Sequence, residues 1–256
     1  MLRRLSLAVA CLCLSIAARA ITVRVTDADG PRVQVSLYAG DVLRVDLPTE
    51  PAAGKQWGLT GRKPPQLEQL GAAQRVFGGR MSNQGTSSFA WRAAAAGEAD
   101  LTLAYGNAAT RTDRPERTVS LQVAISPNPI SADTSAPDAL SQMEHVGTYA
   151  RTERCGDCMA LGEHLELYRS PRGGVFVLRR QYRDTPGGTL TAIMSGTWSA
   201  GGGTADPNVT IYTLEGGDMT EQFRREGDRL IPVDAQQIPA PAPPGEDNAF
   251  HKVAAP

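Results

Sequence analysis

Short runs in which apolar and polar residues alternate recur along most of the chain. Because successive side chains of a β-strand point to opposite faces, each run indicates a strand with one buried face. Turn signals such as Asp29-Gly30-Pro31 and Gly187-Gly188 separate the runs. This pattern predicts an all-β protein and not a parallel α/β fold. The runs cover residues 21–25, 33–37, 42–47, 101–105, 119–125, 161–168, 175–182, 190–198, 209–214, 221–225 and 229–233, with 249–253 as a candidate last strand.

The runs fall into two groups, which predicts two domains. Residues 21–125 form the first group, for which many short strands indicate a sandwich or a barrel. Residues 126–143 contain three prolines and little bulky apolar content, so they are predicted to be a linker. Residues 144–238 carry adjacent strands joined by short turns, as in an up-and-down antiparallel barrel. Residues 239–256 form a proline-rich tail.

The first twenty residues have the features of a secretory signal. Two arginines precede an apolar stretch at 5–16, and a small-x-small cleavage site ends at Ala20. The apolar stretch is shorter than the roughly 20 residues of a membrane-spanning helix. We therefore expect a mature chain that starts near Ile21 and resides in the periplasm or at the outer-membrane periphery. A lipid anchor at Cys11, which follows an imperfect lipidation box, is the alternative to cleavage after Ala20.

The charge balance argues against some classes of partner. Removal of the signal takes away three arginines and no acids, so the formal net charge moves from -1 to about -4. A nucleic acid or an anionic membrane would require a basic surface. We expect neither as a partner, and we expect no transmembrane segment.

Cys155 and Cys158 are the two cysteines that lie outside the predicted signal. In an exported protein they can form a small disulfide loop. As thiolates, with Met159 adjacent and His145 as a further candidate ligand, they would instead suit Cu(I), which prefers soft ligands. A four-residue loop gains only about 2 kcal/mol from chain entropy, so stability alone is a weak reason for the pair. Both interpretations stay open at this point.

Other chemistries fit the sequence poorly. A thioredoxin-like site needs its CxxC to open a helix, whereas a strand pattern follows Cys158. A zinc site lacks a second CxxC or a suitably spaced pair of histidines. The chain has three histidines and neither a G-x-S-x-G nor an H-E-x-x-H motif. We therefore expect no enzymatic activity.

The second half resembles the NlpE family of copper-resistance and envelope-stress lipoproteins. The resemblance is carried, in order, by Gly147-Thr148-Tyr149, the CxxC at 155–158, Gly196-Thr197-Trp198 and the stretch from Leu230 to Asp234. It implies a lipocalin-like barrel outside the cytoplasmic membrane and a role in copper tolerance or envelope sensing. The implied partner is a copper ion or another envelope protein.

The first half more faintly resembles chagasin-like inhibitors of papain-type cysteine peptidases. Residues 50–57 align with the family's first inhibitory loop and keep Pro51, Gly54 and Trp57, and the segment around Gly85 resembles its central loop. The resemblance implies an immunoglobulin-like sandwich that presents three loops at one end to a peptidase.

The chain departs from the chagasin pattern at polar positions. Glu50, Ala52 and Ala53 stand where the family has an asparagine and two threonines, and Arg114-Pro115 is not followed by the family's aromatic residue. Each lost hydrogen bond is worth about 0.5–1.5 kcal/mol. The main expectation is therefore an exported, non-enzymatic envelope protein that acts through Cys155 and Cys158. Inhibition of a cysteine peptidase through residues 50–57 is the alternative.

Overall fold

The computed structural model is composed almost entirely of β-strands, as the alternation of apolar and polar residues predicted. Among the residues that the structure describes, one 3-10 turn, η1 (Asp27–Asp29), interrupts the strands. Within the described part of the chain, no helix is long and apolar enough to cross a membrane. The structure describes residues 20–254, apart from residues 51–53, 78–84, 108–113, 128–142, 157, 171–172, 205, 218 and 243–246.

The first half is a β-sandwich, which we call the sandwich (residues 21–126). One layer has the strand order β1-β3-β7, with β5 and β6 both paired to β7. The other layer has the order β2-β9-β8-β4. The strands of the first layer are β1 (Thr22–Thr26), β3 (Val42–Thr49), β7 (Gly85–Ala93), β5 (Leu67–Gln69) and β6 (Gln74–Phe77). Those of the second are β2 (Arg32–Tyr38), β9 (Arg117–Ser126), β8 (Gly97–Asn107) and β4 (Lys55–Thr60).

The core of the sandwich lies between its two layers. Alternate residues of each strand, such as Val23 and Val25 on β1 or Leu101 and Leu103 on β8, are buried there. Trp91 at the centre is fully buried and stacks on Phe89. The predicted immunoglobulin-like sandwich is thus confirmed, with the apolar face of each period-two strand turned inward.

The second half is a closed antiparallel barrel (residues 144–253), as predicted. In the described residues, eight strands pair in sequence from β10 to β17, and β17 pairs back with β10. Strand β13 pairs with β14 over residues 197–202, so the first part of β13 keeps one edge that does not pair within the barrel. The strands are β10 (Glu144–Glu153), β11 (Ala160–Ser170), β12 (Gly173–Thr185), β13 (Gly188–Gly202), β14 (Thr210–Gly216), β15 (Met219–Glu226), β16 (Arg229–Val233) and β17 (Phe250–Val253).

Side chains fill the middle of the barrel. Trp198 stacks on Tyr212, and its indole N–H donates to the Tyr168 carbonyl oxygen at 2.9 Å. Gly196 lies where β13 comes close to β14, and a Cβ there would lie 2.1 Å from the Glu215 carbonyl oxygen. The Gly-Thr-Trp motif therefore has a packing role. The buried set is Tyr149, Leu165, Leu167, Phe176, Leu178, Trp198, Tyr212, Leu214, Phe223, Leu230 and Phe250.

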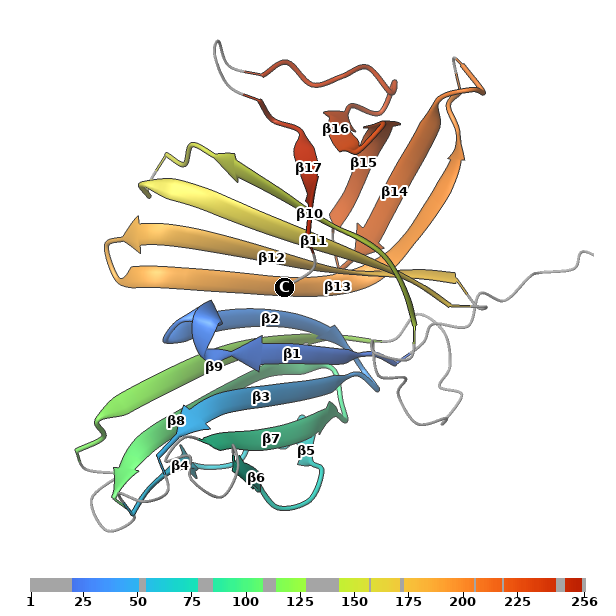
Figure 1. The fold of residues 1–256 in the computed structure, drawn as a ribbon. Helices are drawn as coiled ribbons and strands as arrows, with labels where there is room; N and C mark the ends of the chain where they lie inside the picture. The colour runs from blue at the N-terminus through green and yellow to red at the C-terminus, as the bar shows by residue number, and fades with distance from the viewer. Residues whose placement is uncertain are drawn as a thin grey trace, which may run out of the picture.

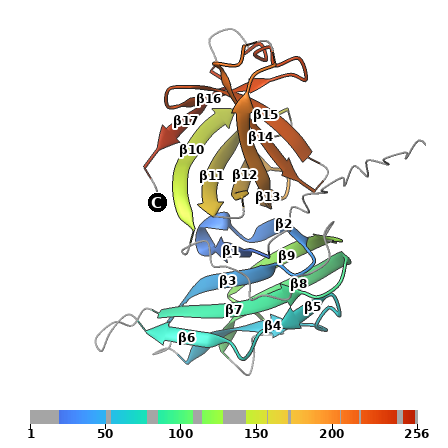
Figure 2. The same ribbon diagram turned by 90° about the vertical axis from the view of Figure 1, so that its right-hand side faces the viewer.

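The sandwich and the barrel are joined by a shared sheet. Strand β2 of the sandwich pairs in parallel with β13 of the barrel, from Thr191 opposite Val33 to Met194 opposite Ser36. Figure 1 shows these two strands side by side at the junction, and Figure 2 shows the same stacking from the side. The outward-facing Val175, Val177 and Ile193 of the barrel belong to the same buried cluster as the sandwich core.

The sequence pattern missed several strands. Strands β4, β5, β6, β7 and β10 lie outside the predicted runs, and β7 is nine residues long. The candidate strand in the tail is confirmed, because β17 closes the barrel. Strand β9 ends at Ser126 and β10 begins at Glu144, while most of the predicted linker lies outside the described residues.

Candidate functional site

Strand register brings three connections of the sandwich to one end. Thr49 at the end of β3 lies opposite Gly85 at the start of β7. Lys55 at the start of β4 lies opposite Asn107 at the end of β8, and β9 begins there at Arg117. We call this the loop end of the sandwich. The segments that leave and re-enter it are 50–54, 78–84 and 108–116.

A buried aromatic pair supports the loop end. Trp57 on β4 is 4% exposed, and its ring lies 5.1 Å from that of Tyr105 on β8. The indole N–H of Trp57 donates to the Pro48 carbonyl oxygen of β3 at 2.8 Å, which ties the two layers together. The Arg117 guanidinium lies 5.5 Å from the centre of the Trp57 ring, within cation–π range. The packing that holds Trp57 thus also fixes where β3 ends and β4 begins.

Two further contacts hold the first connection at the loop end. The backbone N–H of Glu50 donates to the Tyr105 hydroxyl oxygen at 3.0 Å. The Lys55 ammonium contacts the Glu116 carboxylate at 2.7 Å, and the hydrogen bond to Glu116 raises the pKa of Lys55. Gly54 has φ +67, a left-handed conformation that glycine adopts without a steric penalty. The first connection is therefore fastened to β8 and to the end of the third connection.

The residues that carry the resemblance to chagasin-like inhibitors lie as follows. Gly54, Trp57 and Gly85 all lie at the loop end, and Gly85 is the first residue of β7. Pro51 lies outside the described residues. Trp57 is a supporting residue beneath the end, since its side chain is buried.

Cys155 and Cys158 form a disulfide in the segment between β10 and β11, with their Cα atoms 5.2 Å apart. Both cysteines are partly exposed, and Met159 beside them is 76% exposed. The Met159 backbone N–H donates to the Arg183 carbonyl oxygen of β12 at 3.0 Å. The pair thus lies at the end of the barrel where β10 ends and β11 begins, which we call the disulfide end.

His145 does not join the cysteines. It lies at the start of β10, where its ring contacts the Thr148 hydroxyl at 2.9 Å and packs against Tyr168. Cys155 follows the far end of that strand, about 26 Å away at ~3.3 Å per residue. The fold therefore does not bring His145 together with the cysteine pair. No group of three potential metal-binding side chains (His, Cys, Asp or Glu) occurs among the described residues.

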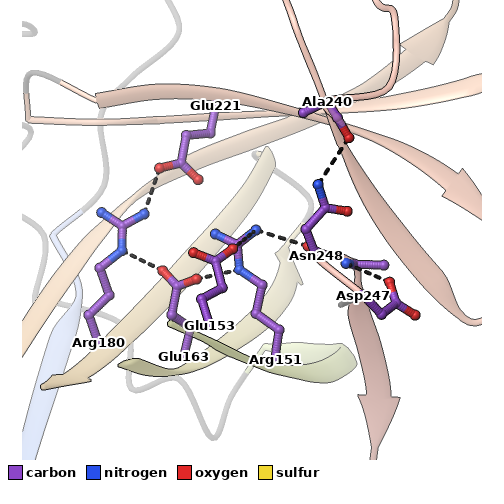
Figure 3. A network of polar contacts seen from close by, with 9 residues as sticks. Arg151, Glu153, Glu163, Arg180, Glu221, Ala240, Asp247 and Asn248 are labelled. Atoms are coloured by element: carbon purple, nitrogen blue, oxygen red, sulfur yellow. Dashed lines mark hydrogen bonds and ion pairs between the residues drawn. The ribbon is translucent and has the colours of Figure 1, made fainter. Parts of the chain in front are cut away.

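A buried charge network occupies the interior of the barrel near the disulfide end (Figure 3). Glu163, which is 1% exposed, accepts hydrogen bonds from the Arg151 and Arg180 guanidinium groups. Arg180 also donates to Glu221 at 2.6 Å. Burial alone would lower the pKa of Arg180, but the hydrogen bonds to Glu163 and Glu221 outweigh it and raise that pKa. Arg151 lies over the Phe250 ring at 4.3 Å. Next to the network is a pocket of about 450 Å³ whose lining includes Arg151, Glu221 and Phe223.

Sequence reasoning missed this network. The sequence did contain a signal for this network, namely a charged residue at a position where the alternation predicts an apolar one. Glu163 lies between Leu161 and Leu165 on the inward face of β11. Arg180 likewise continues the inward row of Phe176 and Leu178 on β12. Such a residue predicts a partner on a neighbouring strand, because an isolated charge in the interior is costly.

Comparison with known proteins gives a sparse result. No protein-family model matches the chain, and no curated protein matches it. A solved structure of EhICP2, a cysteine protease inhibitor from Entamoeba histolytica, is 14% identical with a TM-score of 0.37. Amebosin is 16% identical with a TM-score of 0.32. Each alignment covers 43% of this chain and 100% of the other. At these values the likeness carries no functional argument.

Proposed function

We propose that this chain is an exported, non-enzymatic binding protein whose loop end inserts into the cleft of a papain-type cysteine peptidase. The observation that carries the proposal is the convergence of three connections on one end, above the Trp57–Tyr105 pair. Connections presented by a rigid sandwich commonly form binding surfaces. The chagasin-like motifs in the sequence agree with this location.

The support beneath the connections favours binding by insertion. Trp57 and Tyr105 fasten the first connection at Pro48 and Glu50, so less conformational freedom remains to be lost on binding. The alanines at 52 and 53 have little bulk and few rotamers. Such a segment suits a narrow cleft in which backbone and small side chains make the contacts.

Inhibition of papain tests this proposal. We expect the protein to inhibit active papain at micromolar concentration, and Ala52→Arg to weaken inhibition by at least about tenfold, because a bulky charge would block insertion. Ala95→Arg is the matched control, since Ala95 is exposed in the turn between β7 and β8 at the opposite end. Absence of inhibition, or equal loss in both variants, would contradict the proposal.

The cysteine pair supports a second candidate function in copper tolerance or envelope sensing, as in the NlpE family. It is favoured by the position of the disulfide in a partly exposed segment beside the exposed thioether of Met159. Reduction would provide two thiols next to a soft third ligand. Cu(I) titration of the reduced protein against the Cys155→Ser, Cys158→Ser double variant tests it, and equal copper uptake by both proteins would rule out a site at the cysteines.

A further inference from the structure

Asp41 is a buried carboxylate that has only backbone partners among the described residues. It is 2% exposed and lies at the turn between β2 and β3. Its Oδ1 accepts from the Ile21 backbone N–H at 2.8 Å, and its Oδ2 accepts from the Tyr38 backbone N–H at 2.9 Å. Arg44 of β3 and Arg92, which lies opposite Val42 on β7, pair with Asp46 and with Glu68, respectively.

This arrangement is unfavourable for an ionised carboxylate. Burial raises the pKa of Asp41 to about 7, against the lowering effect of the two backbone hydrogen bonds. A buried charge is ordinarily stabilised by an opposite charge within about 4–6 Å. The ionised carboxylate of Asp41 would therefore be contacted by two backbone N–H groups, while no cationic group among the described residues pairs with it.

The donor on Oδ1 is the nitrogen that signal removal would change. Ala20 ends the predicted cleavage site, and the Ala20–Ile21 amide supplies the N–H that points at Asp41. Hydrolysis of that amide adds water across the C–N bond, leaving a carboxylate on Ala20 and an amine on Ile21 that takes up a proton. The product places an ammonium where a neutral N–H now lies.

We propose that Asp41 is the receptor for the α-ammonium group of Ile21 that is released when the signal is cleaved after Ala20. The new ion pair would fasten the start of β1, which pairs only with β3 among the described strands. The Ile21 side chain is buried, and its carbonyl oxygen accepts from the Val42 backbone N–H at 2.7 Å, so the residue is already in place. Cleavage would thus add an ion pair between Ile21 and Asp41 that stabilises the start of β1 in the sandwich.

The consequence extends to the junction with the barrel. Strand β1 leads directly into η1, where Asp29 contacts Arg179 of β12 at 3.3 Å and its carbonyl oxygen accepts from Thr191 at 2.5 Å. A fastened β1 therefore holds the residues that bridge the sandwich and the barrel. A chain with its signal still attached, or one anchored at Cys11, would lack the ion pair.

Titration of the N-terminal amine tests the proposal on the secreted protein and on chains made with defined starts. Mass spectrometry of the secreted protein should give Ile21 as the first residue. By NMR, the α-amino pKa of the chain that starts at Ile21 should lie at least about one unit above the ordinary 7.7–8.0. A chain that starts at Ala20 should titrate normally, and so should Asp41→Asn.

The control is Asp46→Asn, which alters another buried carboxylate of β3 and should leave the raised amine pKa in place. The comparison of the Ile21 and Ala20 starts leaves every side chain of the folded part unchanged, so it decides the matter even where Asp41→Asn fails to fold. An ordinary amine pKa in the Ile21 chain, or a secreted protein that begins elsewhere, would overturn the proposal.

Discussion

At the residue scale, the interior of the barrel depends on one carboxylate shared by two guanidinium groups. Glu163→Gln should lower the free energy of unfolding by about 3 kcal/mol, because Arg151 and Arg180 would keep their charge without their common partner. Glu153→Gln should cost less than about 1 kcal/mol, since Glu153 is 33% exposed and contacts only Arg151 among the described residues. Urea unfolding of both variants measures the contrast, and equal costs would mean that Glu163 has no special role.

The ionisation of Asp41 should make the stability of the protein depend on pH. In a chain that retains Ala20, its folded pKa of about 7 exceeds the ordinary 3.8, so the native state binds the proton more tightly. The contribution to stability is then complete below about pH 4 and lost as pH rises to 7, by on the order of 3 kcal/mol. Urea unfolding between pH 4 and 8, referenced to Asp41→Asn, measures it. A flat difference across that range would refute the assignment.

At this scale, the sequence identified the residues whose structural roles have a local cause. Gly54 adopts a left-handed conformation and Trp57 packs as a large aromatic residue, and both stand out in the sequence. The partners of Asp41 and Glu163 lie on other strands, so the apolar register of Glu163 indicates a buried charge but does not identify Arg151 and Arg180. His145 is near the cysteines in sequence, but the extended strand β10 separates it from them in space.

At the element scale, close approach of strands explains which glycines the barrel requires. Gly196→Ala should destabilise the protein by about 3 kcal/mol, since its Cβ would meet backbone atoms of Glu215 and Gly216. Gly162→Ala on β11 should be neutral or slightly stabilising, because the space around it is open and alanine loses less entropy on folding. Thermal unfolding of the pair checks this prediction. A tolerated Gly196→Ala would contradict the close approach of β13 and β14 at this point.

The strands that the sequence missed share a physical cause. In β7, Ser87 and Ser88 are buried among apolar neighbours, so the alternation of polar and apolar residues breaks down. In β10, Arg151 faces inward and Gly147 interrupts the apolar row. In β8 and β9, which were predicted correctly, one face is purely apolar and the alternation is unbroken.

At the scale of the whole molecule, the sandwich and the barrel should unfold together. They share a sheet through β2 and β13 and one buried cluster across the junction. Calorimetry should therefore give a single transition. Ile193→Asp places a charge at a position that is 1% exposed in that junction, and it should split the transition in two. Two transitions in the unaltered protein would contradict this coupling.

The sequence indicated two groups of strands and a proline-containing segment between them, which suggested independent units. The pairing of β2 with β13 was beyond such reasoning, because an edge strand selects its neighbour through tertiary packing and not through its own pattern. The barrel-closing role of β17 was similarly hidden, since a four-residue strand gives a weak signal.

The central claim, that the loop end of the sandwich is a peptidase-binding surface, is tested most directly by hydrogen exchange of the mature protein with and without papain whose active-site cysteine is alkylated. We predict slower exchange at the loop end, in residues 49–57 and 105–117, and unchanged exchange in the β7–β8 turn and at the disulfide end. No change on addition of papain, or protection confined to the barrel, would contradict the claim.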